Sequence, residues 1–281
     1  MGAVQEALEK AWPNRSFAIQ TRETHGDRNA QAPLPEIGGQ GLFTAELGLA
    51  LSAGEIDLAV HSHKDLPIEQ PRDLCLGAFL PRGPTDDVLV SQNGYTLETL
   101  PLHAVIGTSS ARRQAQLLWT RPDLRIVNLR GNIGTRLEKS QTLDAIILAQ
   151  AGLERLGLSD RISQILPKSI FLPAPAQGSI AVQCLDRLEY HDLLRPIHDT
   201  NTEHCTAAER AFLKGLGGGC SLPIAAYAEK INAQIHLRVQ VLKPDGSARI
   251  TQESVGDHPV TLGLELAKIC IAEGAHEYLR K

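Results

Sequence analysis

The sequence lacks several features that would each indicate a class of protein. Aromatic residues make up 4% of its 281 residues. No apolar run approaches the roughly 20 residues that a membrane-spanning helix needs. The 28 basic and 32 acidic side chains nearly balance, so no overall field would attract nucleic acid or an anionic membrane. The start MGAVQEALEK has neither the basic nor the apolar region of a secretion signal. These absences predict a cytoplasmic protein that binds neither nucleic acid nor membrane.

Two further absences narrow the chemistry. The five cysteines are widely spread and form no C-x-x-C pair, which argues against a disulfide framework and against a zinc site. Neither G-x-x-x-x-G-K-[ST] nor a strand-linked G-x-G-x-x-G occurs, so nucleotide binding has little support.

What the sequence does contain is an alternation of short apolar runs with helical stretches. The 42% apolar content is enough for a real core, and the runs are followed by polar turn residues and then amphipathic segments. This rhythm predicts an α/β protein with parallel or mixed sheets, whose ligands collect beyond the carboxyl ends of strands. The runs are IDLAVHS (56–62), HAVIGTSS (103–110), LRIVNLRG (124–131) and LDAIILAQ (143–150).

Two proline-rich segments predict crossings between lobes: PRGPTDD (81–87) and FLPAPAQG (171–178). After about residue 198 the pattern changes to one helix, a glycine cluster and alternating strands around the turn PDGS. We therefore expect a first lobe from 1–80 with 176–196, a second lobe at 86–172, and a small C-terminal α+β domain at 198–281.

Arginine outnumbers lysine 19 to 9, and several arginines directly follow predicted strands. Arg112, Arg113, Arg130 and Arg136 lie just beyond two of the runs. Guanidinium forks and helix N-termini both suit carboxylate or phosphate, so we expect a polyanionic ligand. Thr108, Ser109 and Ser110 can cap the next helix and donate to that ligand. The alternative is that these arginines are ordinary solvated helix charges.

The segment HSHKD crowds polar residues at the end of a predicted strand. On an extended chain Ser62 and Lys64 face one way, and His61, His63 and Asp65 face the other. A carboxylate in a partly dry cleft can stabilise a cation or accept a proton, which makes Asp65 the candidate catalytic group. A surface Lys–Asp pair is the alternative. The two histidines are expected to be packed or exposed rather than a metal pair.

Glycines surround two further candidates. Gly217, Gly218 and Gly219 precede Cys220, so this thiol lies in a loop where a bulky group can come close. An inert cysteine is the alternative. Gly38, Gly39 and Gly41 open a predicted helix in which Phe43 could cover a ligand.

Together these segments resemble the successive motifs of the hydroxymethylbilane synthase (porphobilinogen deaminase) family. The matching blocks run in order through nearly the whole chain: THGD (24–27), GGQGLFTAEL (38–47), DLAVHSHKDLP (57–67), GTSSARRQ (107–114), LRGNIGTRL (129–137), DAIILAQAGLERLG (144–157), LPAPAQG (172–178) and AERAFLKGLGGGCSLPIAAYA (208–228). The resemblance implies two lobes like type II periplasmic binding proteins around a cleft, and a third domain that carries a cofactor cysteine.

The resemblance also implies the chemistry. Cys220 would hold a dipyrromethane cofactor covalently, and four porphobilinogen molecules would be condensed with loss of ammonia into linear hydroxymethylbilane by a monomer, without metal or nucleotide. Asp65 would hold pyrrole N–H groups and stabilise cationic intermediates. The implied cofactor-binding residues besides Cys220 are Ser62, Lys64, Thr108, Ser109, Ser110, Arg112, Arg113 and Arg130. The implied substrate-binding residues are Phe43, Arg136, Arg155 and Gln177.

The chain departs from the family pattern at a few positions. Family members begin with a strand and an Arg-x-Ser-Pro-Leu-Ala stretch, and here the sequence starts after it, so we expect an unpaired sheet edge. Glu36 and Gln40 stand where the glycine loop usually has lysines, and Ala176 replaces a glycine. A non-catalytic, two-lobed binder of carboxylates is therefore the alternative to an enzyme. A solute receptor of the periplasmic type is disfavoured, because it needs a signal peptide and no cysteine-bearing third domain.

Overall fold

The computed structural model describes residues 1–21, 41–218 and 222–279, with the backbone alone at 41–43. The chain divides into two compact units. The first joins Met1–Arg82 to Ser179–Glu203, and the second joins Gly83–Gly178 to His204–Lys281. Two of the boundaries, after Arg82 and after Gly178, fall at the proline-rich segments that the sequence predicted as crossings.

The first unit is built on an antiparallel sheet with the order β1-β8-β2. Strand β8 (Ile180–Leu185) lies between β1 (Ala59–Ser62) and β2 (Leu74–Phe79). Its helices are α1 (Gly2–Ala11), α3 (Gly41–Ser52) and α7 (Leu188–Leu194), with short 3-10 turns η1 (His63–Asp65) and η4 (Arg195–Ile197). Within the described residues β1 pairs with β8 alone, so it is an edge strand.

Helices cover both faces of this sheet. Successive strand residues point to opposite sides, so each strand packs against helices on both faces. Val182 and Cys184 of β8 pack with Val4 and Leu8 of α1 and with Leu194 of α7. A separate cluster of Leu51, Ala59 and Leu74 buries α3 against the sheet. The first unit therefore has its own apolar core.

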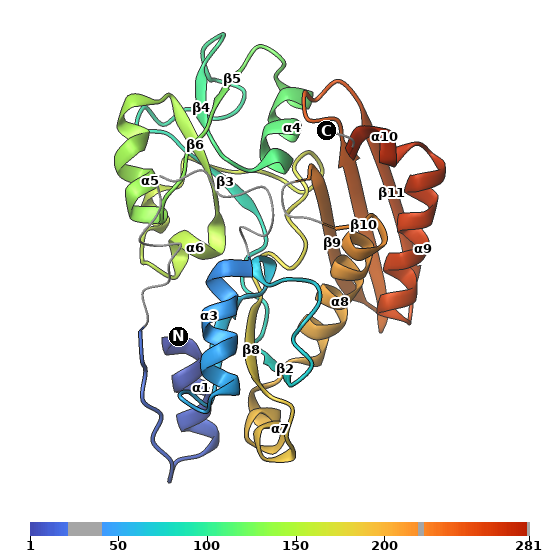
Figure 1. Ribbon diagram of the computed structural model, residues 1–281. Helices are drawn as coiled ribbons and strands as arrows, with labels where there is room; N and C mark the ends of the chain where they lie inside the picture. The colour runs from blue at the N-terminus through green and yellow to red at the C-terminus, as the bar shows by residue number, and fades with distance from the viewer. Residues whose placement is uncertain (22–40, 219–221, 280–281) are drawn as a thin grey trace. The chain divides into compact units, whose positions relative to one another are not determined.

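The second unit contains a mixed sheet with the order β5-β4-β6-β3-β7 (Figure 1). Strand β4 (Val105–Gly107) runs parallel to β5 (Arg125–Val127) and β6 (Ala145–Ala149), and β3 (Asp87–Val90) runs antiparallel to β6 and to β7 (Gln164–Ile165). The connecting elements are α4 (Ala111–Thr120), α5 (Ile133–Lys139), η2 (Ser140–Thr142), α6 (Gln150–Glu154) and η3 (Ser159–Arg161). Because β4, β5 and β6 are parallel, their carboxyl ends share one edge of the sheet.

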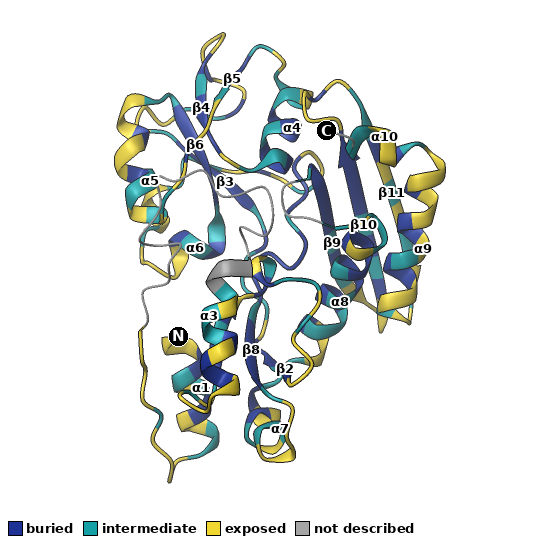
Figure 2. Cartoon of the chain, viewed as in Figure 1, coloured by how far each residue is buried: buried dark blue, intermediate teal, exposed yellow. Residues whose placement is uncertain are grey.

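This sheet is covered on both sides. Leu117 of α4 packs on Leu89 and Ile147, whereas Leu137 of α5 packs on the opposite face with Ile146 and Val88. The central strands are accordingly dark in Figure 2, where burial is shown by colour. Such near-continuous apolar strands are expected where helices cover both faces.

The C-terminal part of the second unit is an antiparallel sheet with the order β11-β10-β9, joined to two long helices. The elements are α8 (Thr200–Gly215), β9 (Ile224–Ile231), β10 (Gln234–Leu242), β11 (Arg249–Gly256), α9 (Pro259–Ala272) and α10 (Ala275–Leu279). Leu262, Leu266 and Cys270 form the buried stripe of α9. A Cβ at Gly263 would lie 2.3 Å from the Ala208 carbonyl oxygen, so only glycine lets α9 approach α8 this closely.

The predicted α/β class and the C-terminal α+β region are confirmed by these sheets. One detail of the prediction is wrong, because the described sheet of the first unit is wholly antiparallel rather than parallel or mixed. No helix among the described residues has the length and apolarity to cross a membrane. The division into three domains at the expected boundaries stays a prediction.

Candidate functional site

The polar residues that follow β4 form the start of α4. Ser110 is the N-cap, and its hydroxyl accepts a hydrogen bond from the Arg113 amide at 3.4 Å. The Ser110 amide donates to Oγ1 of the buried Thr108 at 3.2 Å. Ser109 is exposed, and its hydroxyl donates to the Leu129 carbonyl at 2.6 Å, which ties the end of β4 to the end of β5. The predicted capping role is confirmed for Ser110.

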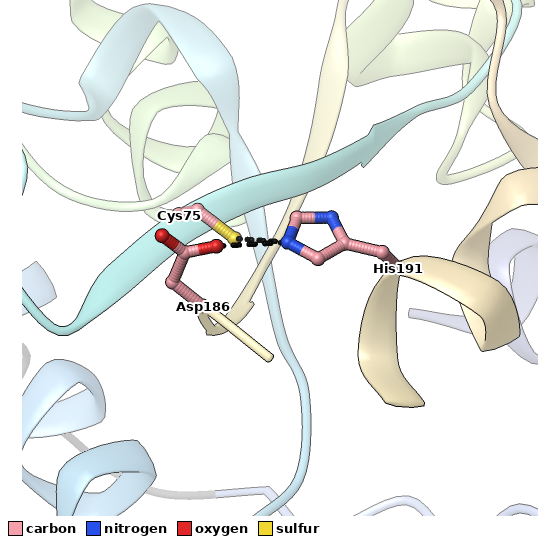
Figure 3. A group of neighbouring side chains, drawn as sticks. All are labelled: Cys75, Asp186 and His191. Atoms are coloured by element: carbon pink, nitrogen blue, oxygen red, sulfur yellow. Dashed lines mark hydrogen bonds and ion pairs between the residues drawn. The ribbon is translucent and has the colours of Figure 1, made fainter. Parts of the chain in front are cut away.

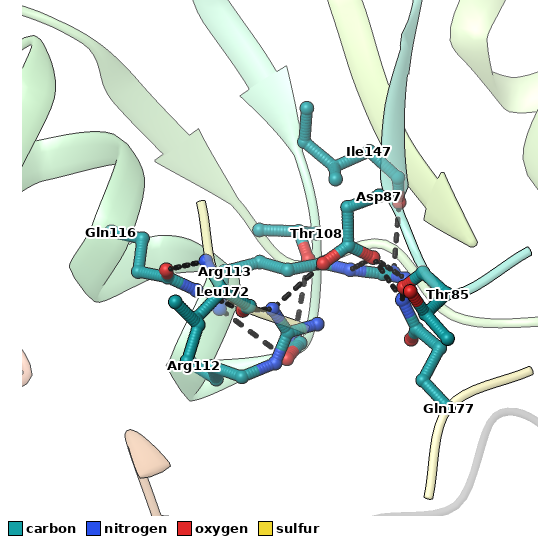
Figure 4. A network of polar contacts seen from close by, with 10 residues as sticks. Thr85, Asp87, Thr108, Arg112, Arg113, Gln116, Ile147, Leu172 and Gln177 are labelled. Carbon is teal, nitrogen blue, oxygen red and sulfur yellow. Dashed lines mark hydrogen bonds and ion pairs between the residues drawn. The ribbon is translucent and has the colours of Figure 1, made fainter. Parts of the chain in front are cut away.

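Arg112 and Arg113 point into the second unit and hold the carboxylate of Asp87 (Figure 4). Arg112 Nη1 lies 2.7 Å from Asp87 Oδ2, and Arg113 donates to Asp87 Oδ1 through Nε at 2.9 Å and Nη2 at 2.6 Å. Both guanidinium groups also donate to main-chain carbonyls, Arg112 to Leu172 at 2.7 Å and Arg113 to Ile147 at 2.9 Å. Both guanidinium forks are therefore buried and paired inside the second unit.

Burial explains why these arginines turn inward. Asp87 is fully buried, and Arg112 and Arg113 are 4% and 6% exposed, so each charge needs a partner of opposite sign. Burial lowers the pKa of Arg112, and the Asp87 carboxylate partly offsets that effect. Arg112 and Arg113 therefore stabilise the start of β3, and their contact with a ligand stays a prediction.

Gln177 extends the same network to the second crossing. Its amide donates to the Thr85 carbonyl at 2.7 Å and to Asp87 Oδ1 at 3.1 Å, and it is buried. Gly178 has φ +85°, and a Cβ there would lie 2.6 Å from the Gly83 carbonyl oxygen. The two proline-rich segments therefore lie against each other, and only glycine fits at position 178.

The remaining predicted arginines lie on segments that follow β5 and β6. Arg130 is exposed, and no described residue binds its guanidinium group. Arg136 of α5 is half-buried and donates from Nε to the Gly131 carbonyl at 2.7 Å. Arg155 donates from Nη2 to the Gly178 carbonyl at 2.9 Å and is otherwise exposed. Positive side chains therefore follow the shared carboxyl edge of the sheet.

The candidate carboxylate Asp65 lies in the first unit, at the end of η1. The predicted alternation fails at Asp65, because β1 ends at Ser62 and a 3-10 turn follows. His61 and His63 are both buried, Ser62 is exposed and Lys64 half-buried, but Asp65 is exposed rather than on the face of the two histidines. The exposed position leaves the Asp65 carboxylate accessible to a ligand.

The two histidines are packing residues, which is one of the two outcomes that the sequence predicted. The His63 ring packs 4.9 Å from the Phe79 ring, centroid to centroid. His61 Nε2 lies 3.2 Å from Gln183 Oε1, on the neighbouring strand β8. Burial lowers the pKa of His61, although the hydrogen bond with Gln183 and the charge of Asp65 act in the opposite direction.

Comparison with known proteins identifies the family of this chain. Residues 1–191 match the family described as porphobilinogen deaminase, dipyromethane cofactor binding domain, and residues 203–272 match the porphobilinogen deaminase C-terminal domain. The chain belongs to the porphobilinogen deaminase family.

Curated members of the porphobilinogen deaminase family match almost the full chain. The proteins of that name from Pelotomaculum thermopropionicum and Moorella thermoacetica are each 46% identical, over 99% of this chain and 91% and 90% of their own lengths. The one from Chlorobium phaeobacteroides is 42% identical over 98% of this chain and 91% of its own length. The family resemblance that the sequence motifs carried is thereby confirmed.

Some solved structures also resemble this chain, at low sequence identity. The Bordetella pertussis BvgS VFT2 domain (double mutant) is 16% identical with a TM-score of 0.41, covering 75% of this chain and 82% of that one. A putative methionine-binding lipoprotein from Bacillus subtilis is 12% identical with a TM-score of 0.37, covering 56% of this chain and 76% of that one.

The porphobilinogen deaminase family domains divide the predicted site. Asp65 and the predicted arginines belong to the cofactor-binding domain, and position 220 belongs to the C-terminal domain. Cys220, Glu36, Gln40 and the glycines at 38 and 39 lie outside the described residues. Phe43 belongs to α3, but only its backbone is described.

Two buried carboxylates escaped the sequence analysis. Asp87 is one of them. The other is Glu209 of α8, which is fully buried and accepts hydrogen bonds from the amides of Ala176 at 2.6 Å and Ala228 at 2.7 Å. An acidic residue within the apolar stripe of Cys205, Ala208 and Phe212 was the available signal. Glu209 thus ties the second crossing to α8 and β9.

Proposed function

We propose that this chain is a hydroxymethylbilane synthase, a transferase that condenses porphobilinogen with loss of ammonia into linear hydroxymethylbilane. The observation that carries the proposal is 46% identity, over 99% of the chain, to proteins named porphobilinogen deaminase. The enzyme serves haem biosynthesis, acts in the cytoplasm as a monomer, and needs neither nucleic acid nor membrane.

The donors of the described chain suit a group that carries several carboxylates. A dipyrromethane has acetate and propionate arms on each ring, and Arg130, Arg136 and Arg155 offer guanidinium groups beyond parallel strands. The capped N-terminus of α4 adds backbone N–H donors beside Ser109. When bound through Cys220, the dipyrromethane supplies the primer on which the product grows.

Asp65 has the electrostatic task in this proposal. Loss of ammonia from porphobilinogen leaves an electron-poor pyrrole, and an exposed carboxylate can stabilise positive charge that develops there. The same carboxylate can accept hydrogen bonds from pyrrole N–H groups. Ser62, which precedes η1, and Lys64, which lies within it, support the position of Asp65 and contribute to cofactor binding.

Arg112, Arg113 and Gln177 act indirectly in this scheme. They hold Asp87 at the start of β3, and thereby orient the segments that carry Thr108, Ser110 and Arg155. Any direct contact of Arg112 or Arg113 with a carboxylate arm would have to compete with Asp87. A role of Phe43 in substrate binding stays a prediction.

Intact-mass measurement tests the cofactor part of the proposal. Wild-type protein supplied with porphobilinogen should carry a covalent addition of two pyrrole units, and Cys220→Ser should carry none. Cys270→Ser is the matched control, because Cys270 is buried in α9 and should leave the addition in place. An unmodified wild-type mass after exposure to porphobilinogen would overturn the assignment.

Two observations favour a second candidate, a carboxylate-binding homologue without turnover. Two of the predicted ligand arginines already share the single carboxylate of Asp87, and Glu36 and Gln40 reduce positive charge in the glycine loop. Ammonia release after addition of porphobilinogen separates the two candidates. The enzyme releases ammonia in repeated turnovers, whereas the binder retains porphobilinogen unchanged.

A further inference from the structure

Three potential metal ligands converge on one face of the first unit. Cys75 belongs to β2, Asp186 follows β8, and His191 belongs to α7 (Figure 3). Asp186 Oδ1 lies 2.8 Å from His191 Nε2, and Cys75 Sγ lies 4.0 Å from the same nitrogen. All three donor atoms lie within 4.8 Å of one another.

Strand pairing and a tight turn create this convergence. Cys75 pairs directly with Cys184 in the β2–β8 register, and their sulfurs lie 3.7 Å apart. Asp186 is two residues further along and remains held to β2, because its amide donates to the Asp73 carbonyl at 3.0 Å. Helix α7 then begins at Leu188, and its first turn brings His191 back over the sheet. Cys75 precedes Asp186 and His191 by more than 100 residues, which is why cysteine spacing did not reveal the group.

The geometry does not suit a nucleophilic relay. In a Cys–His–Asp relay the carboxylate binds one imidazole nitrogen and the thiol binds the other, so that a proton can pass through the ring. Here Cys75 and Asp186 both approach Nε2 of His191. Three donors that point at one position can share a cation there.

The donor types select the kind of cation. Thiolate, imidazole and carboxylate together suit a borderline-soft divalent ion such as Zn²⁺, which is tetrahedral in proteins. Its usual bond lengths place neighbouring donors about 3.3–3.6 Å apart. The observed 4.0 and 2.8 Å separations reach that spacing by side-chain shifts of about half an ångström. Asp186 and His191 are 62% and 42% exposed, so a water molecule can fill the fourth position.

We propose that Cys75, Asp186 and His191 form a binding site for a divalent cation of the Zn²⁺ class, separate from the tetrapyrrole chemistry. The bound ion links β2, the turn after β8 and α7, and therefore stabilises the first unit. This assignment does not depend on the proposed activity, since none of its ligands belongs to the predicted cofactor or substrate residues.

Titration of the chelator-treated full chain with Co²⁺ tests the site, because thiolate coordination gives a charge-transfer absorption band. Wild-type protein should develop the band at one Co²⁺ per chain and show a higher Tm when Zn²⁺ is added. Cys75→Ser should lose both effects, and Asp186→Asn and His191→Gln should each weaken Co²⁺ binding at least tenfold.

Matched variants separate this site from other thiols and carboxylates. Cys220→Ser and Cys270→Ala should retain the band. Asp192→Asn removes an exposed carboxylate of α7 that pairs with Arg195 instead of the proposed cation. This variant should leave the affinity for Co²⁺ unchanged. The proposal is overturned if the wild-type protein shows no band at one equivalent, if the band persists in Cys75→Ser, or if Asp186→Asn and His191→Gln bind Co²⁺ as tightly as wild type.

Discussion

Replacement of Asp87 by asparagine should sharply destabilise the second unit. The substitution keeps the size of the side chain but removes the negative charge that three side-chain donors share: Arg112, Arg113 and Gln177. It leaves two buried guanidinium groups without a negative partner, facing neutral acceptors such as the carbonyls of Leu172 and Ile147.

The burial of the three charges determines how much stability the Asp87→Asn substitution should remove. Asp87 is fully buried and the two arginines are at most 6% exposed, so water cannot replace the lost carboxylate. Removing one partner of such a buried pair costs about 3–5 kcal/mol. That is a large fraction of the roughly 5–15 kcal/mol that stabilises an ordinary domain.

Asp86→Asn is the matched control, because it removes a carboxylate at the adjacent position. Asp86 pairs with Lys168 at 2.7 Å, but these side chains are 18% and 23% exposed. Solvent screens such a pair, so we expect a loss of about 1 kcal/mol or less.

Urea denaturation followed by tryptophan fluorescence measures both variants. Trp119 belongs to α4 in the second unit and Trp12 to the first, so a Trp12→Phe background isolates the unfolding of the second unit. This separation matters because two units need not unfold together. If Asp87→Asn and Asp86→Asn lower the free energy of unfolding by the same amount, the structural role given to the Asp87 network is refuted.

Three further predictions concern catalysis, backbone strain and pH. Asp65→Asn should fold and bind porphobilinogen but turn over on the order of a hundredfold more slowly, since a positioned charge is lost; a near-normal kcat contradicts the assigned role. Ala176→Gly should raise the free energy of unfolding by about 0.5–1 kcal/mol, because Ala176 has φ +62°, whereas Ala174→Gly in the same segment should lower it. Burial lowers the pKa of His61, so below about pH 6.5 the unfolded chain binds more protons than the folded chain. The free energy of unfolding should therefore decrease as the pH is lowered from there toward the pKa of the folded state. Urea midpoints measured across that range should fall less steeply in His61→Gln, and an unchanged slope counts against this linkage.

Much of the fold could be predicted from local patterns. The apolar runs at 103–110, 124–131 and 143–150 became β4, β5 and β6. Ser110 caps α4 as its sequence context indicated, and the PDGS turn joins β10 to β11. These features depend on periodicity and on the conformational preferences of neighbouring residues, which the sequence displays directly.

The candidate site was only partly predictable, because its polar contacts join residues far apart in the chain. Arg112 and Arg113 carried a recognisable motif, but their partner Asp87 begins β3, and all of β3, a loop and β4 separate it from them. The direction of their side chains could therefore not be inferred. The turn at His63–Asp65 likewise overrode the expected alternation at Asp65, which is exposed although the alternation grouped it with the buried His61 and His63.

The sequence by itself therefore determined the family, the succession of strands and helices, and the types of residue available for binding anions. Only the tertiary structure decided which of those arginines form buried ion pairs with Asp87 and which stay exposed. It also brought Cys75, Asp186 and His191 together. The physical reason is that secondary structure follows from short-range periodicity, whereas the pairing of buried charges and distant ligands depends on strand register and burial.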